Sequence, residues 1–237
     1  MAALRVTILG SGTCVPSLER SSCSVLVEAG AAKMVFDLGA GAMKRLLEKG
    51  IVISDITHLF FSHFHPDHTG EFASFLFALK YAGLQRHELP LTIAGSRGLC
   101  DFYSRLLNVY GNWIEQDTTI IEFVEMSNNS YDNKSFDWFD LESRPMNHIE
   151  SSLGYRVSIS EDATVVYSGD TDYCDNLVEL ARGIHKNKTK KKPLLGMGEI
   201  NGFLLDSAKK EIYQKLKRGI QKCPEYTAMQ MDAAVPK

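Results

Sequence analysis

The sequence has few of the features that mark disulfide-rich, membrane-spanning or serine-dependent proteins. Its 237 residues contain five cysteines and no CxxC pair, which is typical of a protein with reduced thiols. No apolar run approaches the roughly 20 residues that a membrane-spanning helix needs, and the first residues do not resemble a secretory leader. The GxSxG motif of serine hydrolases is also absent. We therefore expect a soluble, cytoplasmic protein that does not act at a membrane.

Charge divides the chain into two unequal parts. From Gly183 to the C-terminus there are 12 basic and 5 acidic residues, whereas the preceding part holds 14 basic and 24 acidic residues. The lysine-rich run over 185–193 is typical of a linker or an exposed loop. We predict a domain over residues 1–182 and a basic, divergent C-terminal segment over residues 183–237. A lysine run is more often a solvated segment than a nucleic-acid site.

Strand-like and helix-like patterns together predict an α/β fold. Apolar, β-rich runs predict strands over 4–10, 21–30, 33–41, 56–62, 89–95, 118–126, 136–146, 153–159 and 163–170. Helical spacing with glycine stops predicts helices over 42–50, 71–83, 97–111 and 173–183, and a basic helix over 206–220. The order of these elements indicates two sheets packed on each other, with helices outside.

The stretch HFHPDH, residues 63–68, concentrates metal-ligand side chains on a predicted strand-to-helix loop. Side chains alternate along a strand end, so His63 and His65 point to the same side and can reach one ion. Asp67 and His68 follow the turn at Pro66 and can reach a second ion. Imidazole and carboxylate ligands suit zinc, and also manganese or iron. The cluster therefore predicts a metal site.

A two-metal centre needs ligands from elsewhere in the chain, because four neighbouring residues cannot surround two ions. His148 and Asp170 each lie at the end of a predicted strand. A carboxylate such as that of Asp170 could bridge two ions that lie roughly 3.5 to 4 Å apart. Ser62 and Thr69 flank the cluster and could make hydrogen bonds to its ligands.

These motifs resemble those of the metallo-β-lactamase fold hydrolases, in the branch that contains ribonuclease Z. HFHPDH matches the HxHxDH signature, and the likeness extends over about residues 4–182 through TILGSGTCVPSLERSS, FDLGAG, His148 and YSGDT. The resemblance implies an αββα sandwich with two zinc ions at one edge. It implies His63, His65 and His148 for the first ion, Asp67 and His68 for the second, and Asp170 as the bridge. It also assigns Asp67 the catalytic role of general base.

Two departures from the family pattern limit what the resemblance implies. Ribonuclease Z enzymes usually carry a long arm for tRNA between the third-motif histidine and the bridging aspartate, but His148 and Asp170 are too close in this sequence to accommodate one. The family also has a further histidine after the bridging aspartate. In this chain only His185 follows Asp170, and its placement matches no family motif. We therefore expect the C-terminal part of the fold to be atypical or incomplete.

Three functions follow as alternatives. The first is a zinc-dependent hydrolase that uses a metal-bound hydroxide on a small phosphodiester. The second is a ribonuclease Z-like endoribonuclease that processes the 3′ end of precursor tRNA, with RNA as its substrate. The third is a binding or regulatory isoform whose second metal site is impaired. If the tail does not complete the second sheet, exposed edges would favour a homodimer.

Overall fold

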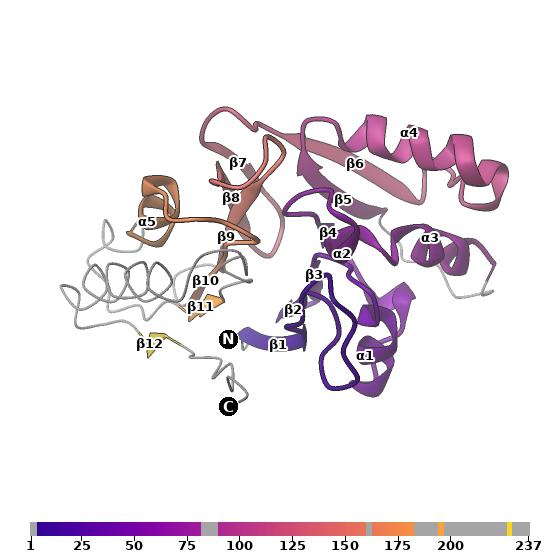
Figure 1. Cartoon of the computed structure of the whole chain (residues 1–237), viewed down its shortest axis with the longest axis horizontal. Coiled ribbons are helices and arrows are strands. Elements are labelled where there is room, and N and C mark those ends of the chain that lie inside the picture. The colour runs from indigo at the N-terminus through magenta and orange to yellow at the C-terminus, as the bar shows by residue number, and fades with distance from the viewer. Residues whose placement is uncertain (1–3, 82–89, 160–162, 183–193, 197–226, 229–237) are drawn as a thin grey trace.

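The computed structural model describes residues 4–81, 90–159, 163–182, 194–196 and 227–228, which form two facing β-sheets with helices outside them (Figure 1). The strands of the first sheet lie in chain order: β1 (Leu4–Gly10), β2 (Ser24–Ala29), β3 (Ala32–Phe36), β4 (His58–Phe60), β5 (Leu91–Ser96) and β6 (Ile121–Met126). The second sheet has the order β12 (Thr227–Ala228), β11 (Leu194–Gly196), β10 (Ala163–Tyr167), β9 (Leu153–Ile159), β8 (Asp140–Pro145) and β7 (Asp132–Ser135).

Strand direction explains where the helices lie. β1, β2 and β3 pair antiparallel, whereas β3 to β6 pair parallel and so need crossover connections. The crossovers contain α1 (Ala42–Glu48), α2 (Pro66–Thr69), α3 (Phe72–Tyr81) and α4 (Leu99–Tyr110), with short turns η1 (Ile53–Asp55) and η2 (Gly111–Trp113). On the opposite side of the molecule, α5 (Asp175–Arg182) covers the second sheet (Figure 1).

Three apolar layers hold these elements together, because each strand of a buried sheet presents side chains to both faces. Between the first sheet and its helices lies a cluster that includes Val35, Leu59 and Phe75. Between the two sheets lies a second cluster, to which Phe36 and Tyr155 contribute from opposite sheets. A smaller third cluster joins α5 to the outer face of the second sheet. The predicted αββα sandwich is therefore confirmed.

Most of the predicted elements occur close to their expected positions, but β7, α2, β11 and β12 were not expected. β7 has the polar sequence DNKS, and α2 lies within the histidine cluster itself. From the basic segment, β11 pairs parallel with β10 and β12 pairs with β11, so this segment extends the second sheet. The domain boundary at residue 182 stays a prediction. The basic helix over 206–220, His87 and His185 lie outside the described residues.

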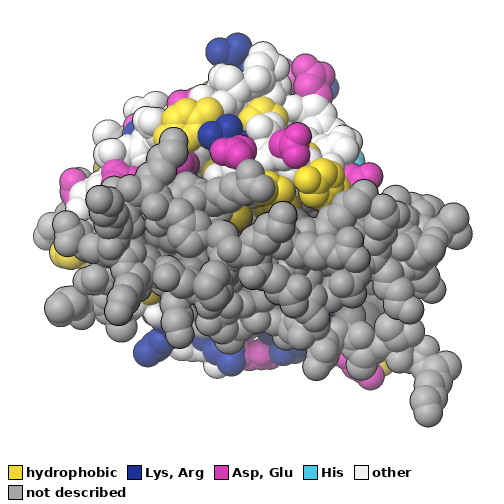
Figure 2. All heavy atoms as spheres, turned by 90° about the vertical axis from the view of Figure 1, so that its left-hand side faces the viewer, with side chains coloured by type: hydrophobic (Ala, Val, Ile, Leu, Met, Phe, Trp, Pro, Cys, Tyr) yellow, Lys and Arg dark blue, Asp and Glu magenta, His cyan; other side chains and the backbone are white. Residues whose placement is uncertain are grey.

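The surface of the described residues is mixed in character. Figure 2 shows hydrophobic, acidic and basic side chains interspersed on the visible described parts of one face. Among the helices that the structure describes, none combines the length and the apolar character required to cross a bilayer. The cytoplasmic location stays a prediction.

Candidate metal centre

The six predicted ligands come from both sheets and meet at their common edge. His63 and His65 lie in the loop after β4, and Asp67 and His68 lie in α2, which begins with Pro66 at its first position. Proline suits this position because its missing N–H would have no partner there. The second sheet contributes His148, after β8, and Asp170, after β10. The site therefore depends on how the two sheets face each other.

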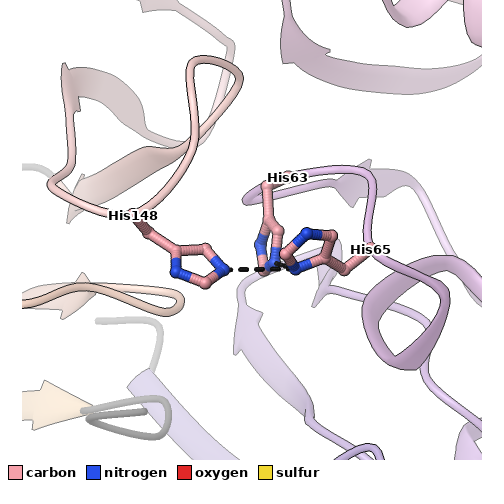
Figure 3. Close-up of side chains that lie close together, drawn as sticks. All are labelled: His63, His65 and His148. Carbon is pink, nitrogen blue, oxygen red and sulfur yellow. Dashed lines mark hydrogen bonds between the residues drawn. The ribbon is translucent and has the colours of Figure 1, made fainter. Parts of the chain in front are cut away.

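Three imidazole rings converge to form the first ligand group. Nε2 of His63 lies 3.0 Å from Nδ1 of His65, and Nε2 of His148 lies 3.1 Å from the same nitrogen. Figure 3 shows the three rings turned toward one another, with His148 approaching from the side opposite to His63 and His65. Three neutral histidines that point their ring nitrogens at one position are a recurrent ligand set for zinc.

The second ligand group lies beside the first and shares residues with it. His63, His68 and Asp170 are buried and bring their ligand atoms close enough to hold one ion. Nε2 of His68 lies 3.4 Å from Oδ2 of Asp170 and 3.9 Å from Oδ2 of Asp67. Oδ2 of Asp170 also lies 4.0 Å from Nε2 of His148. The Asp170 carboxylate therefore faces both groups.

Asp37 belongs to the site, although the sequence pattern did not predict it there. This fully buried carboxylate follows β3, and its Oδ2 accepts hydrogen bonds from Nδ1 of His68 (2.7 Å), the hydroxyl of Ser62 (2.7 Å) and the hydroxyl of Tyr167 (2.6 Å). Its Oδ1 accepts the main-chain N–H of Ser62 at 2.7 Å. With Nδ1 of His68 donating to Asp37, Nε2 is left to face Asp67 and Asp170.

The backbone around Asp37 brings the FDLGAG segment, residues 36–41, against residues 61–68, which we call the metal loop. Asp37 has a positive φ of 57°, a conformation that aspartate tolerates better than most residues. A side chain at Gly39 would lie 2.3 Å from the main-chain oxygen of Asp67, so only glycine fits there. The main-chain N–H of Leu38 donates to the oxygen of His68 at 2.7 Å. These contacts fix the orientation of α2.

The flanking hydroxyls behave as the sequence suggested, with one difference. The hydroxyl of Ser62 lies 3.0 Å from Nδ1 of His63, so it contacts a predicted ligand directly. The hydroxyl of Thr69 instead donates to the main-chain oxygen of His65 at 3.0 Å. His58, in β4, lies apart from the ligand groups, in edge-on contact with Phe136 and Phe139.

The predicted histidine ligands differ in their pKa values. Burial lowers the pKa of His63 to about 3, and the positive charge of His68 acts in the same direction. Burial also lowers the pKa of His148. These two rings are therefore neutral at pH 7, as metal ligands must be. Burial alone would lower the pKa of His68, but the carboxylates of Asp37 and Asp170 raise it to about 10. A metal ion that takes Nε2 of His68 must therefore displace a proton.

The chemistry of the six predicted ligands suits a bound cation. Oδ1 of Asp170 is buried and has no hydrogen-bond partner among the described residues, and leaving a buried carboxylate oxygen without a partner is costly. A metal ion next to this oxygen would compensate its charge. The structure thus brings together His63, His65, Asp67, His68, His148 and Asp170. Their roles as ligands, and the catalytic role of Asp67, stay predictions.

The fold and the HxHxDH turn at the edge of its paired sheets define the class: a ribonuclease Z-like protein of the metallo-β-lactamase fold, a class of metal-dependent hydrolases. The family described as anti-Pycsar protein Apyc1 matches residues 4–188, and the chain belongs to this family.

Similar proteins agree with this assignment. A ribonuclease Z from Mycobacterium bovis is 28% identical over 192 residues, which cover 76% of this chain and 67% of that protein. The crystal structure of human tRNase Z, short form, superposes with a TM-score of 0.71 at 19% identity, over 95% of this chain and 96% of the human chain. A diphosphatase from the PhnP family superposes with a TM-score of 0.58 at 18% identity, over 92% of this chain and 83% of the other. The predicted family resemblance is confirmed.

Proposed function

We propose that this protein is a zinc-dependent hydrolase that cleaves a phosphodiester. The observation that carries the proposal is the convergence of His63, His65 and His148 beside the buried group of His63, His68 and Asp170. The first three histidines would hold one ion. Asp67 and His68 would hold the second, and Asp170 would lie between both.

The chemistry of a zinc pair suits phosphodiester hydrolysis. When bound, two zinc ions lower the pKa of coordinated water and neutralise charge on phosphoryl oxygens. The chain's own residues would orient the attacking water and accept its proton. Asp67, at the start of α2, would accept a proton from the attacking water through its carboxylate. The neutral rings of His63 and His148 would supply lone pairs, and Asp37 would keep the proton of His68 on Nδ1.

A small phosphodiester is favoured as the substrate by the short connection between His148 and Asp170. The residues of this connection that the structure describes include β9 and β10, and so short a connection offers no separate arm to grip a large RNA. The alternative of tRNA 3′ processing is favoured by the 28% identity to a ribonuclease Z over most of the chain. The two alternatives differ in whether precursor tRNA is cleaved at its 3′ side.

The first experiment measures zinc-dependent hydrolysis of bis(p-nitrophenyl) phosphate by the purified full chain. We expect Asp67→Ala to reduce turnover about 100-fold or more, because proton transfer by a positioned group contributes about that much. Asp101→Ala is the matched control, since Asp101 is exposed on α4 and pairs only with Arg105 among the contacts described. Equal turnover by both variants would contradict the proposed role of Asp67.

A binding isoform is the third alternative, and the number of zinc ions distinguishes it from an enzyme. The ligand that the family supplies after Asp170 has no described counterpart in this chain, since His185 lies outside the described residues. The expected homodimer could supply such a ligand from a second copy. Sedimentation velocity of the zinc-loaded protein would show whether the dimer forms.

A further inference from the structure

The metal centre requires the two sheets to be held at a fixed distance, because each sheet supplies only part of it. His63, His65, Asp67 and His68 follow β4 of the first sheet, whereas His148 and Asp170 follow strands of the second. Nε2 of His148 now lies 3.1 Å from Nδ1 of His65, and a small shift of one sheet over the other would separate them. Hydrogen bonds between the two sheets near the metal loop can therefore hold the two parts of the centre in place.

Tyr155 makes the first such contact. It lies in β9, its side chain is fully buried, and its hydroxyl donates to the main-chain oxygen of Phe61 at 2.7 Å. Phe61 lies two residues before His63 on the other sheet. Beside this contact, the main-chain N–H of Leu153 donates to the oxygen of Ser62 at 2.8 Å. The start of the metal loop is thus bound to β9.

Tyr167 makes the second contact. It lies in β10 directly opposite Tyr155, as a paired residue of the same sheet, and it is also buried. Its hydroxyl donates to Oδ2 of Asp37 at 2.6 Å, and that oxygen also accepts Nδ1 of His68. The thiol of Cys23 lies 3.1 Å from the same hydroxyl. Since the hydroxyl proton is directed to Asp37, the thiol is the donor in this contact.

We propose that Tyr155 and Tyr167 are positioning residues that act as a pair to fix the metal loop of the first sheet against the second sheet. Tyr155 acts through the main chain before His63, and Tyr167 acts through Asp37 on His68. The inference rests on the proposed metal centre and assigns these residues no contact with the substrate.

The position of the two hydroxyls separates this role from simple core packing. Both rings belong to the apolar cluster between the sheets, and phenylalanine would fill the same space. A buried hydroxyl is costly unless it is bonded. The Tyr155 hydroxyl is bonded to the main chain just before His63, and the Tyr167 hydroxyl is bonded to Asp37, which itself accepts a hydrogen bond from His68. Removing each hydroxyl therefore tests its hydrogen bond and leaves the packing of the ring in place.

The two substitutions should affect different ions. Tyr167→Phe removes a donor from Asp37 and loosens His68, which belongs to the second ligand group. Tyr155→Phe loosens the main chain before His63 and His65, which belong to the first group. Substitutions of residues that orient metal ligands typically reduce metal affinity about 10- to 100-fold. We expect a reduction of this size, mainly at the second ligand group for Tyr167→Phe and at the first ligand group for Tyr155→Phe.

Zinc affinity of the full chain, measured by competition with a chromogenic chelator after removal of metal, tests the inference. Tyr103→Phe is the control, because its half-buried hydroxyl is likewise bonded, to Ile114 and Gln116 on α4's side of the first sheet. Urea unfolding of each metal-free variant shows the loss of stability. We expect Tyr103→Phe to lose stability without losing zinc affinity.

The outcomes separate this inference from the proposed function. If wild-type protein binds zinc and both Tyr155→Phe and Tyr167→Phe bind it as tightly as Tyr103→Phe does, the positioning role is wrong and the metal centre stands. If wild-type protein binds no zinc, both proposals fail. A loss of affinity in the two site variants that exceeds the control supports the inference, and it needs no measurement of hydrolysis.

Discussion

At the scale of single residues, Asp37 organises more of the metal centre than any ligand does. It is fully buried, and its carboxylate accepts four hydrogen bonds, from Ser62 twice, His68 and Tyr167. Burial alone would raise the pKa of Asp37, but the charge of His68 and its hydrogen bond hold it below the ordinary value. Asp37 is therefore ionised at neutral pH and ready to orient His68.

Asp37→Asn should destabilise the protein and weaken zinc binding together. The amide nitrogen cannot accept the bonds that one carboxylate oxygen now accepts, and breaking a buried charged pair costs on the order of 3 to 5 kcal/mol. We expect a loss of that size in the free energy of urea unfolding. Asp101→Asn is the control, because its exposed pair with Arg105 contributes about 1 kcal/mol or less. Equal losses in the two variants would argue against the assigned role.

His58 should make the protein sensitive to acid. Burial lowers the pKa of His58 to about 4, and the charge of Lys134 acts in the same direction. The unfolded chain, with an ordinary value near 6.5, therefore takes up the proton first as the pH falls. The stabilisation from a neutral His58 is complete above about pH 6.5 and is lost as the pH falls toward 4, by on the order of 3 kcal/mol.

Urea unfolding between pH 7.5 and pH 4.5 checks this prediction. His58→Phe keeps the ring contacts with Phe136 and Phe139 but has no proton to gain, so its stability should fall less with acid. Thr57→Val is the control, since it removes the partner of Nδ1 and keeps the titrating ring. If wild-type protein and His58→Phe lose stability in parallel, His58 is not the acid-sensitive group.

Which residues the sequence could reveal depends on how locally they act. His63, His65, Asp67 and His68 fall within six positions, so their chemistry is visible in the sequence. Asp37 acts at a distance through hydrogen bonds that need the fold, although its position after an apolar strand and before two glycines was a usable signal. The pairing of Tyr155 with Tyr167 depends on strand register, which the sequence pattern does not specify.

At the scale of elements, the metal loop and α1 are joined through one side chain. Both oxygens of Glu71, just after α2, accept hydrogen bonds at 2.7 Å from the main-chain N–H groups of Gly41 and Met43 at the start of α1. These N–H groups would otherwise lack partners, and a negative charge is favourable at a helix N-terminus. Glu71 therefore caps α1 from a neighbouring loop.

Glu71→Ala should cost about 1 to 2 kcal/mol in the free energy of unfolding, which is the usual effect of removing an N-terminal cap. Glu48→Ala is the control, because Glu48 lies in the last turn of α1 and makes only exposed contacts with Lys44 and Arg45 among those described. Thermal unfolding of both variants measures the difference. A smaller effect of Glu71→Ala than of Glu48→Ala would contradict the capping role.

Elements with a strong pattern were predictable, and those without one were not. The helices α3 and α4 and the apolar strands of both sheets show the spacing that burial imposes. The polar strand β7 pairs with β8. Its sequence, DNKS, has no alternation of apolar and polar residues that would predict a strand. The strands β11 and β12 lie in a segment that composition marked as divergent. The parallel pairing of β11 with β10 and of β12 with β11 could not be read from composition.

At the scale of the whole molecule, we propose that the two sheets together hold two zinc ions. The first sheet supplies four of the predicted ligands and the second sheet supplies His148 and Asp170. Metal that binds only the folded chain also stabilises it, by about 2.7 kcal/mol when free zinc exceeds its dissociation constant 100-fold. Removal of zinc by a chelator should therefore lower the midpoint of thermal unfolding as well as stop hydrolysis.

The most direct test of this claim is the zinc content per chain, measured by elemental mass spectrometry on the purified full chain and on His148→Ala. We expect two zinc ions per wild-type chain and about one in the variant, which loses a ligand of the first ion only. One ion or none in the wild-type chain, or an unchanged number in His148→Ala, would contradict the two-metal centre.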